Sequence, residues 1–229
     1  MVNVTGTKLY AAYVRLFGQV LDESDTPSRD DEILYESSGV LTVWPSEREP
    51  SPSPLFVENG CLSGRFDYSL FLDAVSEKRV REHYEHLLLK SGRITSIAQF
   101  LRRHPRSKRA VVDVWEQPAG HVSGQDPCLM YLWFRVEGQD LVCHAHFRSN
   151  DVVRKLLLNM HILVAIQDHL AKELGVRRGY YRHVADSFHM HTRDEIQIER
   201  LRHRFARASV DTSTTARHSI ADFDPPHRW

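Results

Sequence analysis

The sequence predicts an α+β fold in which a mixed β-sheet is backed by one long apolar helix. Two observations support this: residues 150–174 are strongly apolar over a helical length, and residues 128–147 are typical of two strands joined by a short polar turn. Strand and helix patterns follow one another without the regular rhythm of a parallel βαβ fold. A chain of 229 residues is also long enough to form one domain with a sizeable core.

The first half of the chain predicts mostly helices. Residues 8–21 carry apolar side chains at helical spacing, which indicates an amphipathic helix. Residues 38–44 are β-branched and aromatic and predict a strand, whereas Pro45–Pro54 is rich in Pro, Ser and Glu and predicts a surface loop. Two further helices are expected over residues 66–90 and 93–104.

The second half predicts the hairpin and the long helix. The hairpin strands are expected over 128–136 and 141–147, with Gly138 supplying the turn. The long helix is expected to begin beside three consecutive candidate N-caps, Ser149 to Asp151, and to end at Gly175 as its C-cap. The other expected elements are strands over 110–115 and 179–191 and a charged helix over 194–205.

The domain organisation follows from these elements. We expect a single domain over residues 1–208. The polar composition after Ser209 predicts a flexible C-terminal tail over 209–229.

Composition restricts the class of protein. Lys plus Arg equals Asp plus Glu, so the overall charge does not favour nucleic acid as a ligand, and the basic stretch 199–207 is better explained as a solvated helix. Three unpatterned cysteines do not suggest a secreted disulfide framework. Charged residues interrupt the early apolar positions, and the most apolar run, 156–166, is too short for a membrane span. We therefore expect a soluble cytoplasmic protein.

The most informative residue is Cys128, which follows Pro127. A single cysteine is more often a small buried apolar residue than a nucleophile. Its neighbours in the sequence change that balance: Asp126-Pro-Cys-Leu is followed by Phe-Arg-Ser-Asn-Asp at 147–151, then by Asn159 and by Ser-Phe-His-Met-His at 187–191. This ordered set resembles the thymidylate synthase family, which includes the pyrimidine nucleotide hydroxymethylases. From Trp115 to His191 the spacing agrees without insertion or deletion, and the resemblance covers about Gly92 to Asp194.

The resemblance implies a thymidylate-synthase-like fold and a homodimer whose active sites are built from both chains. It implies one-carbon transfer from 5,10-methylenetetrahydrofolate to C5 of a pyrimidine nucleoside monophosphate. The catalytic residues that it implies are Cys128, Tyr84 and Asn159. The substrate-binding residues that it implies are Arg29, Lys108, Arg109, Arg148, Ser149, Asp151, His189 and His191, with Lys108 and Arg109 donated across the dimer interface.

The residue types fit that chemistry. C5 of a pyrimidine becomes nucleophilic when a thiolate adds to C6, so Cys128 needs nearby cations to ionise at neutral pH. Arg148 ends the strand that pairs with the Cys128 strand and can serve both the sulfur and a phosphate. Arg148 and Ser149 also lead into the expected N-terminus of the long helix, where free backbone N–H groups and the helix dipole favour a phosphate. On its own, the basic turn that holds Lys108 and Arg109 is more often a solvated turn.

Asn159 has two interpretations. An amide inside an apolar helix must find a partner, so it could be a satisfied core side chain. In the resemblance it holds the pyrimidine edge, where an amide can donate to O4 and accept from N3–H of uracil. That pattern favours uracil over cytosine, unless the amide flips.

Histidine content raises the question of a metal. His144 and His146 share one strand face, as do His189 and His191, and such pairs can bind zinc. No cysteine or carboxylate lies beside them at ligand spacing in the sequence, so we predict no metal site.

The chain departs from the family pattern on the folate side. Thymidylate synthases usually carry a Glu-x-x-Trp helix and further tryptophans that assist hydride transfer, but residues 66–77 lack that motif, and Asp73 or Glu77 could supply the acid. Leu129 and Phe147 resemble archaeal-type synthases and hydroxymethylases. Hydroxymethylation is therefore the favoured reaction. The alternatives are methylation of dUMP and a non-catalytic nucleotide-binding paralogue, which the missing acid would favour and the retained Cys128 argues against.

Overall fold

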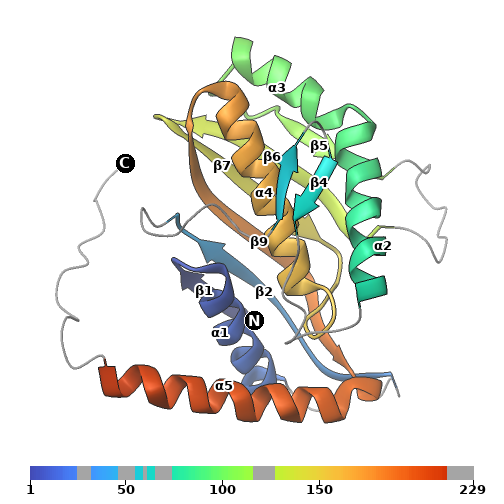
Figure 1. The fold of residues 1–229 in the computed structure, drawn as a ribbon, viewed down its shortest axis with the longest axis vertical. Helices are drawn as coiled ribbons and strands as arrows, with labels where there is room; N and C mark the ends of the chain where they lie inside the picture. Colours follow the sequence, from blue (N-terminus) through green and yellow to red (C-terminus); the bar gives the residue numbers. More distant parts are fainter. Residues whose placement is uncertain (25–31, 46–54, 59–60, 65–73, 116–126, 216–229) are drawn as a thin grey trace.

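The computed structural model describes residues 1–24, 32–45, 55–58, 61–64, 74–115 and 127–215 (Figure 1). Its main feature is a seven-stranded sheet with the strand order β1-β2-β9-β7-β6-β5, in which β8 also pairs with β9. The strands are β1 Val2–Gly6, β2 Ile33–Val43, β5 Val111–Asp113, β6 Leu129–Glu137, β7 Asp140–Phe147, β8 Asn150–Asp151 and β9 Arg177–His191. The β1/β2, β7/β9 and β8/β9 pairs are parallel and the others antiparallel, which confirms the predicted mixed sheet.

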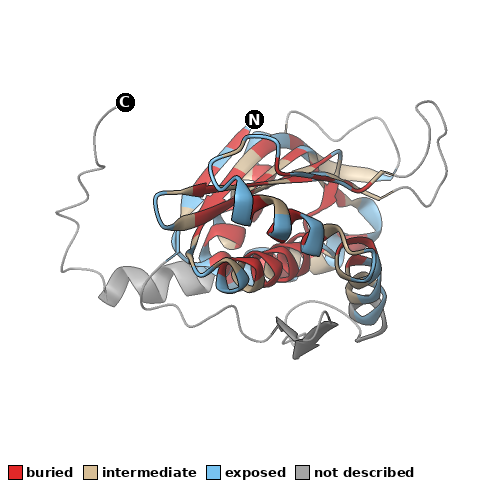
Figure 2. Ribbon diagram, turned by 90° about the horizontal axis from the view of Figure 1, so that it is seen from above, coloured by how far each residue is buried: buried red, intermediate tan, exposed pale blue. Residues whose placement is uncertain are grey.

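The helices gather on one face of this sheet (Figure 2). They are α1 Leu9–Glu23, α2 Ala74–Tyr84, the π-helical turn η2 Glu85–Lys90, α3 Arg93–Arg103, α4 Leu156–Leu174, the short 3-10 turn η3 Thr192–Asp194 and α5 Glu195–Thr215. A separate hairpin is formed by β3 Leu55–Glu58 and β4 Cys61–Gly64.

The long helix α4 is the centre of the core. It is buried on nearly all sides because it contacts β7 and β9 on one side and α1 and α3 on others. Gln167 is one of two buried polar residues in the helix, with Asn159: its Nε2 donates to the carbonyls of Leu141, Gly179 and Tyr180 and so fixes the helix to the sheet. The helix ends as predicted at Gly175, which has a φ of 70°.

The hairpin that carries Cys128 also forms as predicted. Strands β6 and β7 pair from Leu129–Phe147 to Glu137–Asp140, and Gly138 has a φ of 62° in the connecting turn. That conformation favours glycine, so the turn residue sets the register of the pair.

Some predicted bounds differ from the structure, and others lie outside the described residues. The helix expected over 66–90 is described only from Ala74 and changes to a π-helical turn at Glu85, and the loop expected over 45–54 lies almost wholly outside the described residues. Strand β2 begins at Ile33, well before residue 38, because its first half pairs with the end of β9. The last helix, expected to end at residue 205, continues to Thr215. The single-domain boundary at residue 208 stays a prediction.

A substitution at Gly39 can test the packing between β1 and β2 at the edge of the sheet. It pairs with Val2, and a Cβ atom at Gly39 would overlap the Val2 carbonyl group. We expect Gly39→Ala to lower the free energy of unfolding by about 1–3 kcal/mol in urea titrations, because β1 must move away. Gly18→Ala is the matched control. It lies within α1, where an added Cβ meets no described atom within 4 Å, so it should be neutral or stabilise by about 0.5–1 kcal/mol. A Gly39→Ala protein with wild-type stability would contradict this packing.

Candidate active site

Cys128 lies at the open end of the β6–β7 hairpin, directly before Leu129, and is half-buried. The backbone N–H of Arg148 donates to the Cys128 carbonyl at 3.0 Å. The Ser149 hydroxyl lies 3.7 Å from Cys128 Sγ, and Arg148 Nε lies 3.4 Å from the Pro127 carbonyl oxygen. The hairpin thus brings Cys128, Arg148 and Ser149 together, as their strand register predicts, and their catalytic and phosphate-binding roles stay predictions.

Tyr84 reaches the same region from the end of α2. Its side chain is buried, and burial raises its pKa, with the neighbouring Cys128 thiol raising it further. The phenol therefore keeps its proton at neutral pH and can act as a hydrogen-bond donor near the sulfur. The structure thus places Tyr84 near Cys128, and its catalytic role stays a prediction.

Cys143 provides a contrast. It is fully buried within β7, and burial raises the pKa of its thiol. A thiol in that environment stays protonated and inaccessible, so of the two cysteines whose side chains are described, only Cys128 is available as a nucleophile.

The expected start of the long helix beside Ser149 is wrong, and with it the helix N-terminus that was expected to favour a phosphate there. The long helix begins at Leu156, not beside Ser149, and its N-cap residue Lys155 makes no side-chain capping hydrogen bond. Asn150 and Asp151 instead pair in parallel with Phe188 and His189 of β9, and the Val152 N–H donates to the His189 carbonyl. These hydrogen bonds to β9 use the backbone groups of residues 150–152 that would otherwise form the first turn of the helix. A phosphate beside Arg148 and Ser149 would therefore not lie at the N-terminus of α4.

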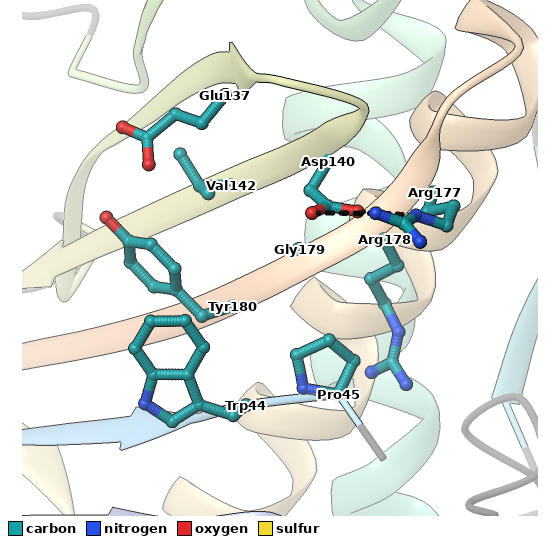
Figure 3. Close-up of a pocket in the computed structure, with 9 residues that line it drawn as sticks. All are labelled: Trp44, Pro45, Glu137, Asp140, Val142, Arg177, Arg178, Gly179 and Tyr180. Atoms are coloured by element: carbon teal, nitrogen blue, oxygen red, sulfur yellow. Dashed lines mark hydrogen bonds and ion pairs between the residues drawn. The ribbon is translucent and has the colours of Figure 1, made fainter. Parts of the chain in front are cut away.

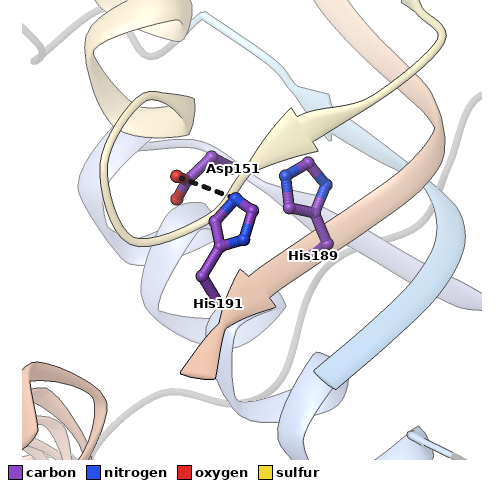
Figure 4. A group of neighbouring side chains, drawn as sticks. All are labelled: Asp151, His189 and His191. Carbon is purple, nitrogen blue, oxygen red and sulfur yellow. Dashed lines mark ion pairs between the residues drawn. The ribbon is translucent and has the colours of Figure 1, made fainter. Parts of the chain in front are cut away.

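A group of three polar side chains forms where β8 meets β9 (Figure 4). Ligand atoms of Asp151, His189 and His191 lie within 4.8 Å of one another, and Asp151 Oδ2 is 3.9 Å from His191 Nε2. His191 Nδ1 lies 3.1 Å from the Glu32 carbonyl oxygen, which can only accept. In neutral His191 the proton is therefore on Nδ1, and Nε2 presents a lone pair to the group.

Asp151 and His189 are held in place by their own neighbours. Asp151 is buried and its Oδ1 accepts from the Arg154 backbone N–H at 2.8 Å. The Arg154 guanidinium in turn contacts Asp194, with Nε 2.7 Å from Oδ2. Burial lowers the pKa of His189, with Asp151 acting in the opposite direction, and its Nδ1 lies 3.3 Å from the Ser187 hydroxyl.

The pairing of β8 with β9 supplies the carboxylate that the spacing in the sequence does not. Sequence spacing puts no carboxylate beside His189 and His191, but β8 brings Asp151 next to both. Two imidazoles and a carboxylate are a donor set that divalent metals can use, and the same acceptors suit the hydroxyl hydrogens of a sugar. The prediction of no metal site stays a prediction.

Asn159 lies in the first turns of α4 and is 4% exposed. Its Nδ2 donates to Asn150 Oδ1 at 3.1 Å, so the buried amide has a partner within the protein. This bond uses one of the two Nδ2 hydrogens, which leaves one donor and the Oδ1 acceptor for another group. Its contact with a base stays a prediction.

Two of the predicted basic residues lie far from Cys128 within one chain. Lys108 and Arg109 are exposed in the turn before β5, and the next residue, Ala110, accepts from the Phe134 backbone N–H. The strand from Cys128 to Phe134 spans roughly 20 Å at about 3.3 Å per residue. Lys108 and Arg109 therefore cannot serve the Cys128 of their own chain in this arrangement. Arg29 lies outside the described residues.

A separate hollow of about 490 Å³ lies at the opposite end of the hairpin, between Trp44, Glu137 and Tyr180 (Figure 3). Arg177 and Asp140 form an ion pair at its rim, with Nε 2.8 Å from Oδ1. None of the predicted site residues lines it. We therefore assign the candidate active site to the Cys128 end of the hairpin.

The structure adds two residues that sequence reasoning missed. Asn150 bonds Asn159 on one side and His183 on the other, with its Nδ2 2.8 Å from His183 Nε2. Asn150 belongs to the Phe-Arg-Ser-Asn-Asp motif but had no expected role beyond a helix cap. His183 carries no local sequence signal, because a histidine at an inward-facing strand position is not distinctive.

Comparison with known proteins identifies the family. The family model for thymidylate synthase matches residues 69–226. A thymidylate synthase homologue of Methanocaldococcus jannaschii is 30% identical over 107 residues, covering 44% of this chain and 48% of the relative. Thymidylate synthase of Streptococcus pyogenes serotype M5 is 27% identical over 129 residues, covering 54% and 46%. The chain thus spans about half the length of these curated relatives.

Two further findings bear on the class of protein. Within the described residues, the helices are too short or too polar to cross a lipid bilayer. The family model covers well over half of the chain and includes the cysteine hairpin, β8, α4 and β9, which carry the site described above. The chain belongs to the thymidylate synthase family.

Proposed function

We propose that this protein transfers a one-carbon unit to C5 of a pyrimidine nucleoside monophosphate through a covalent adduct between Cys128 and C6. The observation that supports this most directly is the position of Cys128, half-buried at the end of the hairpin with Ser149 and Arg148 beside it. The family to which the chain belongs supports the same class of reaction.

The chemistry divides one difficult step into easier ones. The Cys128 thiolate adds to C6, which makes C5 nucleophilic, and 5,10-methylenetetrahydrofolate supplies the electrophilic one-carbon unit when bound. Once C5 has bonded to that unit, its proton leaves to a base and the bond from the unit to the folate nitrogen breaks, which leaves an exocyclic methylene on the ring. Hydride from the reduced folate, or hydroxide from water, then adds to this methylene as the Cys128 thiolate leaves C6, which restores the C5–C6 double bond. Tyr84, protonated and buried next to the sulfur, is suited to hydrogen-bond the pyrimidine or the water that moves the C5 proton.

The product of the reaction is a methyl or a hydroxymethyl nucleotide. The curated relatives are named as thymidylate synthases, which supports methylation of dUMP as the first candidate. Hydroxymethylation is the second candidate, because residues 66–77 lack the Glu-x-x-Trp motif and its tryptophan. Without a hydride transfer step, water would capture the exocyclic methylene instead.

A homodimer would complete the site, and the open face of the sheet supports one. On the face opposite α4, side chains alternate outward from β6, β7 and β9. We call this the aromatic face; it comprises Tyr131, Trp133, His144, His146, Tyr180, Arg182 and Val184. Tyr131 stacks on His146 with ring centroids 5.2 Å apart, the His144 ring lies tilted against Trp133 and Tyr180, and Tyr131 is 39% exposed. A surface of this kind is typical of a protein–protein interface.

An unpartnered guanidinium nitrogen on this face also favours a partner chain. Arg182 Nε is buried and has no hydrogen-bond partner among the described residues, although its guanidinium lies over the Tyr180 ring at 5.4 Å. A buried donor of this type costs about 1–3 kcal/mol when left unsatisfied. A second copy of the chain could supply the acceptor, and it would bring its own Lys108 and Arg109 towards a site that they cannot reach in cis.

The experiment that tests the function uses four substrates. The protein is incubated with methylenetetrahydrofolate and each of dUMP, UMP, dCMP and CMP, every nucleotide carrying tritium at C5, and the products are weighed by mass spectrometry. We expect tritium release and a mass gain on a uracil nucleotide, since Asn159 can donate to O4 and accept from N3–H. A gain of one methylene indicates methylation, and a further oxygen indicates hydroxymethylation. Binding of nucleotides without any tritium release would favour the non-catalytic alternative.

A further inference from the structure

A chain of four buried polar side chains runs from α4 along the inner face of the sheet. Asn159 Nδ2 donates to Asn150 Oδ1 at 3.1 Å, and Asn150 Nδ2 lies 2.8 Å from His183 Nε2. His183 Nδ1 lies 2.8 Å from the Tyr181 hydroxyl. None of the four side chains is more than 4% exposed, so water cannot replace a lost bond.

The polarity of this chain follows from the protonation of His183. Burial lowers the pKa of His183 to about 3, so the ring is neutral at physiological pH and carries one N–H. Because Asn150 Oδ1 accepts from Asn159, its Nδ2 must face His183 Nε2 as a donor. Nε2 is then the acceptor, and Nδ1 carries the proton and donates to the Tyr181 oxygen.

The His183 ring cannot swing to avoid these constraints. Phe147 stacks on one side with centroids 4.4 Å apart and planes at 8°, and Phe188 lies 5.8 Å away at 30°. Only the position of the proton on the ring can change.

Reversing Asn159 would therefore require concerted changes along the whole chain. A flipped Asn159 directs its oxygen at the Asn150 oxygen, so Asn150 must flip as well. That puts an oxygen against the His183 Nε2 lone pair, so the proton must move from Nδ1 to Nε2 and Tyr181 must become a donor. If only some of these groups reverse, two hydrogen-bond acceptors or two donors face each other in a buried site, which is unfavourable.

We propose that Asn150, His183 and Tyr181 are positioning residues that hold the Asn159 amide in one orientation and thereby set the preference of the enzyme for uracil over cytosine. This proposal rests on the proposed function, in which Asn159 meets the pyrimidine edge. In the orientation held by Asn150, the second Nδ2 hydrogen and Oδ1 match O4 and N3–H of uracil. Cytosine reverses both groups and would need the flipped amide.

The test compares two substitutions of Asn150 by the ratio of kcat/KM for the uracil and cytosine nucleotides of the same sugar. Wild type should discriminate by roughly tenfold to a hundredfold. Asn150→Ala releases Asn159, and the ratio should fall to within about threefold of unity, because an unheld amide can serve either base. Asn150→Asp is the matched control: its carboxylate still accepts from Asn159 Nδ2, so the ratio should stay within about threefold of the wild-type value.

A second measurement needs no substrate and reports the hydrogen-bond chain directly. Long-range ¹H–¹⁵N NMR of the wild-type protein, with the His183 signals identified by their loss in His183→Gln, should report a neutral ring protonated at Nδ1. In Asn150→Asp the proton should move to Nε2 or the ring should become doubly protonated, because a carboxylate only accepts.

The outcomes separate the two proposals. If wild type releases no tritium from any of the four nucleotides, the proposed function fails, whatever the NMR result. If wild type turns over but Asn150→Ala keeps the full discrimination ratio, the positioning proposal fails alone. A wild-type His183 ring protonated at Nε2 would also overturn it, because the chain would then run in the opposite direction.

Discussion

Replacing Cys128 by Ser is expected to abolish turnover and tritium release from C5, by on the order of a thousandfold or more. A serine hydroxyl ionises far less readily than a thiol, so it cannot form the C6 adduct at neutral pH. Nucleotide binding should be largely retained, because the side chain is only half-buried and the groups proposed to bind the nucleotide are unchanged. Tritium release and equilibrium binding measured on the same preparation check both expectations.

Cys143→Ala is the control for this variant. Cys143 is buried within β7 and burial raises its pKa, so its removal should leave turnover within about threefold of wild type even if stability falls by the cost of a small cavity. Turnover by Cys128→Ser within tenfold of wild type would contradict the assignment of Cys128 as nucleophile.

The elements that the sequence predicted well are those whose signals are local. The Cys128 hairpin was predicted from alternating strand residues and from Gly138. Its turn requires a positive φ at that position, which glycine adopts readily. The end of α4 depends in the same way on Gly175. Because these signals lie within a few residues of the structure that they specify, no knowledge of the rest of the chain is needed to interpret them.

The errors arise where distant segments compete for the same backbone. Asn150 and Asp151 are good N-caps by residue type, but β9 offers them ladder hydrogen bonds, so they form β8 and the helix starts later. Strand β1 went unpredicted for a related reason. It is a short strand at the sheet edge, and it is specified by its parallel pairing with β2, which places Val2 against Gly39.

Some residues of the candidate site could be grouped from local sequence signals, and others could not. Cys128, Arg148 and Ser149 could be grouped from sequence, because a hairpin register relates them directly. The proximity of Asp151 to His189 and His191 could not, since it requires the β8–β9 pairing. His183 could not be identified from the sequence, because its importance comes from its buried partners Asn150 on β8 and Tyr181 on β9.

The positions of the basic residues predict that two inactive chains can complement each other. Within one chain Lys108 and Arg109 lie at the far end of β6 from Cys128, whereas Arg148 lies beside it. If the proposed dimer forms through the aromatic face, each active site would combine Cys128 and Arg148 of one chain with Arg109 of the other. A site of this kind can be rebuilt from two inactive chains only when the two lesions are in different halves.

We therefore expect Arg109→Ala and Cys128→Ser chains, each inactive alone, to recover activity when they are unfolded together and refolded as a mixture. Random pairing makes half of the dimers hybrid, and each hybrid has one intact site, so the mixture should reach roughly a quarter of wild-type activity. Mixing Arg148→Ala with Cys128→Ser chains is the matched control. Arg148 and Cys128 belong to the same half of the site, so no hybrid site is complete and activity should stay at the level of the separate chains. Equal rescue in both mixtures, or none in either with hybrid dimers demonstrated by native mass spectrometry, would contradict a shared site.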